Sequence, residues 1–350
     1  MQAGLFPYGF ALAIAFGAQG AAAEPAKVLE QVVHLRPPSP GGSGADPDEL
    51  PSTNASWNHD SGKLELAEGQ SAPVEHEARW RGLSANCSYL APKGDFLREN
   101  GTYDVIVHFH AGMMAEKQFR DTRLEAVFVS CGFGIGSGPY ASAFADPTLF
   151  GRMLDSLSKD IGAIAHHPGA KPGHVGLASW SAGFAAVGKI LGVARYYDRI
   201  DAVVLMDSLH SQYLAPNPHT AAQGAERVDL TMIEPLVRFA RDASTGAGKT
   251  MVMSHSSIIP PDYASSAEAT AALLGAIGVA SHETDATNER GIHMYYRADA
   301  GQLHVQGFRG KGPREHFAHL YLIGEHLQSW VVPQWKRAAT LAYTPDREQR

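Results

Sequence analysis

Uninterrupted runs of apolar residues recur along this chain, each of them short enough to form a single β-strand. They include residues 103–110 (YDVIVHFH), 124–131 (LEAVFVSC), 200–207 (IDAVVLMD) and 249–256 (KTMVMSHS). Alternating apolar and polar residues would indicate strands with one face in water, whereas continuous Val, Ile and Leu indicate strands covered on both faces. The pattern therefore predicts an α/β fold, with a mostly parallel central sheet and helices on both faces.

The segment 175–191, VGLASWSAGFAAVGKIL, passes from a buried strand into a helix through a cluster of small residues. A sharp strand-to-helix turn lifts one side chain clear only if the residues two positions either side of it are small. Around Ser181 these residues are Ser179 and Gly183, whereas Ser179 has the large Leu177 two positions before it. The spacing therefore selects Ser181, at the sheet edge where α/β folds place their sites.

The pentapeptide SWSAG resembles the nucleophile elbow G-x-S-x-G of the α/β-hydrolase superfamily, with Ser in place of the first Gly. The resemblance covers roughly residues 80–335 and also includes the order of the strands. It implies a serine esterase or lipase-like enzyme in which Ser181 is the nucleophile. In this superfamily the chain order is Ser, then Asp or Glu, then His.

A serine hydroxyl needs a general base, and the base needs a carboxylate to orient it. Asp207 ends the run 200–207, at the position after the sixth strand that some lipase-like members use for the acid. Asp262, in SSIIPPDYAS, matches the commoner position after the seventh strand, but it lies well past its strand and behind two prolines. We predict Asp207 as the acid, with Asp262 as the alternative.

The resemblance places the base in the loop after the last strand, at the start of the closing helix. His316 follows the Gly- and Pro-rich loop RGKGPRE most closely, and His319 is the alternative, deeper in the helical run. Two backbone N–H groups are expected to stabilise the oxyanion. One belongs to Ala182, and the loop after residues 103–110 supplies the other from Gly112 or Met113.

Several further features are expected near the substrate. The Gly-rich stretch 131–140 lacks the glycine spacing of a nucleotide-binding loop and is interpreted as a flexible loop that walls the cleft, with Tyr140 at its rim. An insertion at about residues 208–248, after the sixth strand, is predicted to form a small lid. The candidate pocket residues are His110, Tyr140, Trp180 and His210.

Composition excludes other partners. The net charge of −7 and the pI of about 6.2 argue against nucleic acid, because no basic stretch is present to displace phosphate counterions. No apolar run is long enough for stable membrane insertion. His108 and His110 share one strand face, but Gly112 and Met113 follow where a binuclear site would need Asp and His. We therefore predict no metal site and no cofactor.

The ends of the chain differ from its middle. Residues 1–23 resemble a signal peptide with an A-x-A cleavage site, although no basic residue precedes the apolar run. Residues 24–62 read as a flexible arm, 63–338 as the catalytic domain and 339–350 as a polar tail. The protein is predicted to be secreted or periplasmic. There, Cys87 and Cys131 would be either one disulfide or two buried thiols.

Together these features predict an exported serine hydrolase that cleaves a carboxylic ester through a Ser-His-Asp triad and an acyl-enzyme intermediate. The substrate class is a small-molecule or polymeric ester. Two alternatives stay open: a non-catalytic binding module on the same fold, and an amidase or peptidase that uses the same triad. The sequence leaves acyl size and oligomeric state open.

Overall fold

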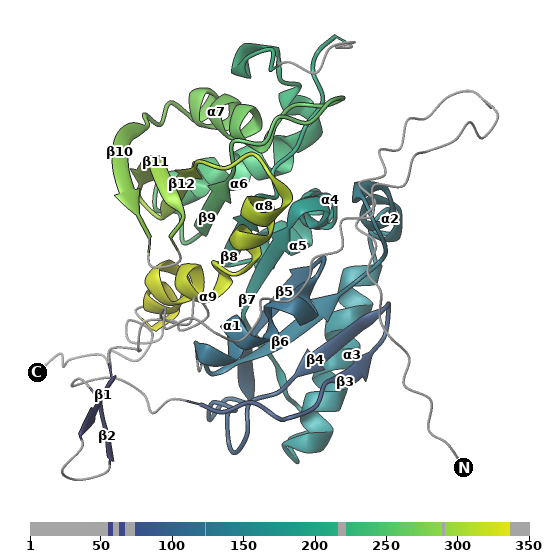
Figure 1. Cartoon of the computed structure of the whole chain (residues 1–350). Coiled ribbons are helices and arrows are strands. Elements are labelled where there is room, and N and C mark those ends of the chain that lie inside the picture. The colour runs from purple at the N-terminus through teal and green to yellow at the C-terminus, as the bar shows by residue number, and fades with distance from the viewer. Residues whose placement is uncertain are drawn as a thin grey trace, which may run out of the picture.

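The computed structural model describes residues 55–58, 63–66, 74–122, 124–215, 222–288 and 291–336. The expected signal peptide (1–23) and polar tail (339–350) lie outside the described residues, as does most of the expected arm (24–62). Ten strands form one sheet in the order β10-β11-β12-β9-β8-β7-β5-β6-β4-β3 (Figure 1). A separate antiparallel pair is formed by β1 (Ala55–Asn58) and β2 (Lys63–Leu66).

The central strands of the sheet are parallel, and the strands at both edges are antiparallel. The parallel strands are β5 (Thr102–Phe109), β6 (Ala126–Cys131), β7 (Lys171–Trp180), β8 (Ala202–Met206), β9 (Thr250–His255) and β12 (Leu303–Phe308). The edge strands are β3 (Arg81–Leu83), β4 (Cys87–Leu90), β10 (His282–Thr287) and β11 (His293–Ala300). The predicted fold class is confirmed.

Helices cover both faces of this sheet because its central strands bury side chains on both sides. In β5, Val105 and Val107 belong to one apolar cluster and Ile106 to another. The first cluster includes side chains of α2 (Ser137–Ala143), α3 (Leu149–Ile164), α4 (Phe184–Leu191), α5 (Ala194–Arg199), α6 (Glu234–Ser244) and α7 (Ser266–Ile277). The second includes side chains of α1 (Glu116–Asp121), α8 (Pro313–Leu320), α9 (Ile323–His326) and the π-helical η5 (Leu327–Val331).

Short 3₁₀ segments occupy the turns that follow several strands. They are η1 (Gly112–Ala115), η2 (Ser181–Gly183), η3 (Ala225–Arg227) and η4 (Leu230–Ile233). Among the described residues, no helix is both long and apolar enough to cross a lipid bilayer.

The helix expected within the lid has a different place in the structure. Leu236, Phe239 and Ala240 of α6 are buried in the core, and α6 packs against β9 and α4 as the crossover between β8 and β9. The lid prediction is therefore wrong for α6. A covering role for residues 208–215 and 222–233, which precede this helix, stays a prediction.

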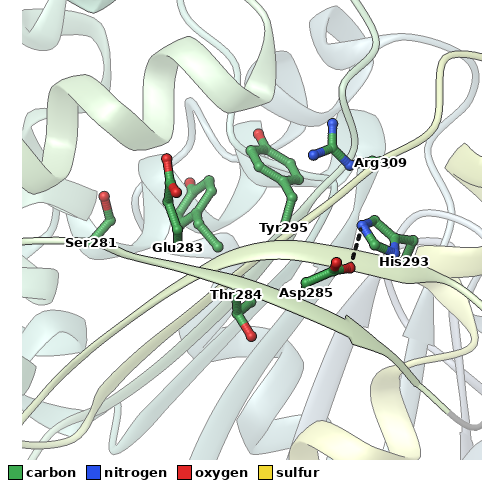
Figure 2. Close-up of a pocket in the computed structure, with 8 residues that line it drawn as sticks. Ser281, Glu283, Thr284, Asp285, His293, Tyr295 and Arg309 are labelled. Atoms are coloured by element: carbon green, nitrogen blue, oxygen red, sulfur yellow. Dashed lines mark ion pairs between the residues drawn. The ribbon is translucent and has the colours of Figure 1, made fainter.

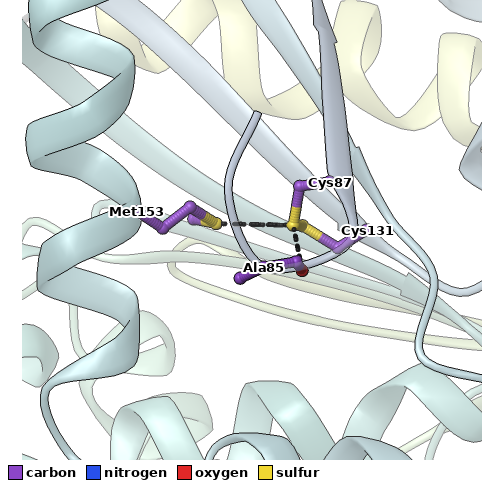
Figure 3. Close-up of a disulfide and its surroundings, with 4 residues drawn as sticks. All are labelled: Ala85, Cys87, Cys131 and Met153. Atoms are coloured by element: carbon purple, nitrogen blue, oxygen red, sulfur yellow. Dashed lines mark hydrogen bonds between the residues drawn. A yellow bond between two sulfur atoms is a disulfide. The ribbon is translucent and has the colours of Figure 1, made fainter. Parts of the chain in front are cut away.

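The two cysteines are joined in a disulfide across the antiparallel pair β4–β6. Cys87 and Cys131 are directly opposite each other, and the Met153 sulfur of α3 lies 3.7 Å from the Cys87 sulfur (Figure 3). The bond closes a sequence separation of 44 residues. It therefore ties the antiparallel edge of the sheet to the parallel centre and removes much of the freedom of the unfolded chain.

We expect the double variant Cys87→Ala/Cys131→Ala to be less stable than the wild type by about 2–4 kcal/mol, because its unfolded chain regains the entropy that the cross-link removes. Urea titrations of both proteins measure the difference in free energy of unfolding. Reductant should lower the midpoint of the wild type and leave that of the double variant unchanged. Equal midpoints for all samples would contradict the cross-link's contribution.

Candidate active site

Ser181 lies at the tight turn between β7 and α4. Its backbone has φ +51°, in the left-handed region that few residues other than glycine adopt. A Cβ on Gly183 would lie 2.3 Å from the carbonyl oxygen of Phe109 in the neighbouring strand, so only glycine fits there. The turn is therefore strained and closely packed, as expected for an elbow that presents one hydroxyl.

The first small position of the elbow is Ser179, and its hydroxyl has a defined partner. Ser179 Oγ lies 2.8 Å from Ser208 Oγ, and Ser208 Oγ donates to the carbonyl oxygen of Ser181 at 2.8 Å. Because Ser208 uses its only hydrogen on that carbonyl, the Ser179 hydroxyl is the donor to Ser208. Serine thus replaces the usual glycine without leaving a buried polar atom unpaired.

Asp207, directly after β8, is hydrogen-bonded to His316 in the first turn of α8. His316 Nδ1 lies 2.6 Å from Asp207 Oδ2, with 18% of the histidine side chain and 2% of the aspartate side chain exposed. The other carboxylate oxygen accepts the Ser256 N–H at 2.9 Å and the Ser266 hydroxyl at 2.5 Å. Burial alone would raise the pKa of this carboxyl, but the hydrogen bonds from His316 and Ser266 hold it well below its usual range.

The alternative acid and base lie elsewhere. Asp262 is exposed in the loop after β9, and no contact within the described residues joins it to His316. His319 is fully buried, with Nδ1 3.0 Å from Ser254 Oγ, and burial lowers its pKa to about 4. The structure therefore brings Asp207 together with His316 and leaves both alternatives outside this pair.

Backbone N–H groups are available where the oxyanion donors were expected. Ala111 precedes η1 with φ +57°, and its carbonyl accepts the N–H of Met114 at 2.9 Å. Within the described part of the chain, the N–H groups of Gly112, Met113 and Ala182 have no acceptor. These are the free N–H groups expected at the start of a helical turn.

Two of the expected pocket residues are buried. Tyr140 is on α2, with 1% of its surface exposed, because residues 137–140 are helical and not part of a flexible loop. Its predicted place at a rim is therefore wrong. Trp180 is 2% exposed, packs against the His316 ring with centroids 4.5 Å apart, and donates from Nε1 to the His316 carbonyl oxygen at 2.9 Å. Trp180 therefore helps to hold His316 in place through both its ring and its hydrogen bond.

The other two expected pocket residues, His110 and His210, pack against aromatic rings. His110 stacks on Trp180 at 5.3 Å and 10° between the ring planes. The ring of His210 lies between those of Phe184 and Tyr263, at 5.5 and 5.3 Å. Burial lowers the pKa of each of these two histidines to about 4. The sequence offered no signal for the packing of these rings.

A separate pocket lies over the hairpin of β10 and β11 (Figure 2). Its lining is polar and aromatic: the Arg309 guanidinium lies 5.3 Å from the centre of the Tyr295 ring, and His293 pairs with Asp285 at 3.3 Å. None of the expected catalytic residues lines it. Among the described residues, no group of three or more His, Cys, Asp or Glu side chains is placed to hold a metal ion.

Similar solved structures are esterases. The chain is 13% identical to a zinc-bound cold-adapted esterase from an Arctic intertidal metagenomic library, covering 74% of this chain and 94% of that one (TM-score 0.36). A native structure of a cold-adapted esterase from the same kind of library is 12% identical, covering 75% of this chain and 96% of that one (TM-score 0.35). An esterase of Pyrobaculum calidifontis is 12% identical over 74% of this chain and 85% of that one (TM-score 0.37). No family model and no curated protein matches. The mostly parallel sheet with helices on both faces is the fold class that the sequence predicted.

Three wholly buried histidines make stability depend on pH. Burial lowers the pKa of His108, His319 and His326 to about 3, 4 and 3, whereas the unfolded value is about 6.5. Below pH 6.5 the unfolded chain therefore binds more protons, and stability falls as the pH falls toward 4.

Each of these histidines should contribute a loss of about 1.4 kcal/mol per pH unit in that window, or roughly 4 kcal/mol between pH 6 and pH 5 for all three. Urea titrations at several pH values measure this slope. His326→Leu should reduce the slope by the share of one ring, about 1.4 kcal/mol per pH unit, because that ring no longer titrates. A free energy of unfolding that does not change from pH 7 to pH 5 would contradict the burial of these rings.

Proposed function

We propose that this protein is an exported serine hydrolase that cleaves carboxylic esters through an acyl-enzyme intermediate. The observation that carries the proposal is the 2.6 Å hydrogen bond between His316 and the buried Asp207, in a fold that holds Ser181 at a strained turn. A carboxylate bonded to Nδ1 fixes the imidazole so that Nε2 can accept a proton. This is the arrangement that activates a serine hydroxyl.

In the proposed reaction, Ser181 Oγ attacks the ester carbonyl carbon while His316 Nε2 takes the hydroxyl proton. The carbonyl π electrons move to its oxygen, where the N–H groups of Ala182 and of Gly112 or Met113 stabilise the negative charge. Collapse of this intermediate expels the alcohol, which receives the proton from His316. Water then attacks the acyl carbon while His316 Nε2 takes its proton. The bond between the acyl carbon and Ser181 Oγ breaks, Oγ receives that proton from His316, and the carboxylic acid is released.

Exposed apolar side chains support an ester that carries an apolar group. Six large hydrophobic residues in the segments after β5, β6, β8 and β9 are about half exposed or more: Met113, Met114, Ile135, Leu214, Met232 and Ile259. The carboxyl ends of parallel strands meet at one edge of the sheet, which is also the edge that carries Ser181. Both a small-molecule ester and a polymer chain with apolar segments fit this proposal.

Export is supported by the disulfide between Cys87 and Cys131, because such bonds persist mainly in oxidising compartments. The expected signal peptide in residues 1–23 points the same way. A secreted or periplasmic location is therefore part of the proposal.

Turnover of a short-chain p-nitrophenyl ester tests the chemistry. Ser181→Ala should lower kcat/KM by at least about 10³-fold, because the acyl-enzyme can no longer form. Ser244→Ala is the matched control: this serine is at the end of α6 and donates to the Arg241 carbonyl oxygen, so its removal should leave turnover unchanged. Equal rates for wild type and Ser181→Ala would favour a binding module, and activity on amides alone would favour an amidase.

A further inference from the structure

We propose that His110 is a further catalytic residue of this site, whose neutral ring donates a hydrogen bond from Nε2 to the carbonyl oxygen of the bound ester. Tyr140 is the positioning residue that places the ring hydrogen on Nε2. The inference deepens the proposed function and rests on it. It assigns a side-chain donor beside the expected backbone donors of the same loop.

The backbone around His110 is strained and held in place. His110 and Ala111 follow β5 with φ +71° and +57°, two consecutive left-handed residues that are not glycine. Such strained residues persist only where their surroundings hold the backbone in place. The His108 ring stabilises this turn, because its Nε2 lies within hydrogen-bond distance, 2.9 Å, of the carbonyl oxygen of His110. The turn thus places His110 in the loop that also carries Gly112 and Met113, with its ring against Trp180 and Tyr140.

The hydrogen bonds of Tyr140 decide which ring nitrogen of His110 carries the hydrogen. The buried Tyr140 hydroxyl lies 2.8 Å from His110 Nδ1. If Nδ1 carried the hydrogen, the buried O–H of Tyr140 would be left without an acceptor, which is unfavourable. Tyr140 therefore donates to Nδ1, and the neutral ring carries its hydrogen on Nε2.

The ring is neutral and fixed in orientation. Burial and the neighbouring His316 lower the pKa of His110 to about 4, so His110 does not compete for the proton that His316 takes during the reaction. Trp180 contacts both rings, with centroid distances of 5.3 Å to His110 and 4.5 Å to His316. Because Trp180 directly precedes Ser181, the elbow, the base and His110 share one rigid support.

Nε2 of His110 is open to a ligand. The residue is partly exposed, and within the described ranges no protein atom is hydrogen-bonded to this nitrogen. A donor left open in a strained loop at a candidate active site is suited to a substrate oxygen. The ester carbonyl oxygen is the acceptor that gains negative charge there, so the bond would strengthen in the transition state.

Steady-state kinetics on a p-nitrophenyl ester test the donor. His110→Phe keeps a flat ring beside Trp180 but has no donor, and we expect kcat to fall by about a hundredfold with little change in KM. His110→Gln restores an N–H and should recover at least a tenfold part of that loss. An unchanged kcat in His110→Phe, or a loss confined to KM, would overturn the proposal. Thermal unfolding of each variant shows that it is folded.

The tautomer is tested on the wild-type protein without any turnover. A long-range ¹H–¹⁵N spectrum of the histidine rings at pH 7, assigned with His110→Gln, should show His110 protonated at Nε2 alone. In Tyr140→Phe the ring should become a mixture of both neutral forms. A wild-type ring protonated at Nδ1, or at both nitrogens, would overturn the proposal. Absence of esterase activity with the expected spectrum would instead count against the proposed function.

Discussion

The buried carboxylate of Asp207 is the interaction on which the arrangement of the site depends. A carboxylate out of contact with water costs several kcal/mol unless it is paired and hydrogen-bonded. Asp207 gains its partners from three separate segments: the Ser256 N–H after β9, the Ser266 hydroxyl on α7, and the His316 ring on α8. The hydrogen bonds of this one carboxylate therefore fix the segments after β8 and β9 and the start of α8 relative to one another.

The same region ties the elbow to the histidine through backbone atoms. Ser208, next to Asp207, donates to the carbonyl oxygen of Ser181, and Trp180, next to Ser181, donates to the carbonyl oxygen of His316. Ser181 is thus held by the residue next to Asp207, and His316 by the residue next to Ser181. This coupling explains how three residues far apart in the chain can be positioned without any bound group between them.

Local sequence patterns predicted much of this architecture. Both the burial of a strand and the small residues of a tight turn depend on residues that are close together in the sequence. Tertiary contacts decided the rest. Asp207 and Asp262 both follow strands, and only the position of α8 separates them. The apolar face of α6 does not reveal which layer it covers, so the helix was wrongly expected in a lid. The cysteine pairing depends on the register between β4 and β6. The burial of Tyr140 depends on the helix α2, which the Gly-rich sequence did not suggest.

The most direct measurement of the central claim is the rate at which a fluorophosphonate labels Ser181, read by peptide mapping of the folded protein. The account predicts a single modified serine at position 181, with labelling slowed by about 10³-fold or more in Asp207→Asn, since the histidine loses the partner that orients it. Asp262→Asn, which changes an exposed residue, should label at the wild-type rate. No label at Ser181, or equal slowing in both aspartate variants, would contradict it.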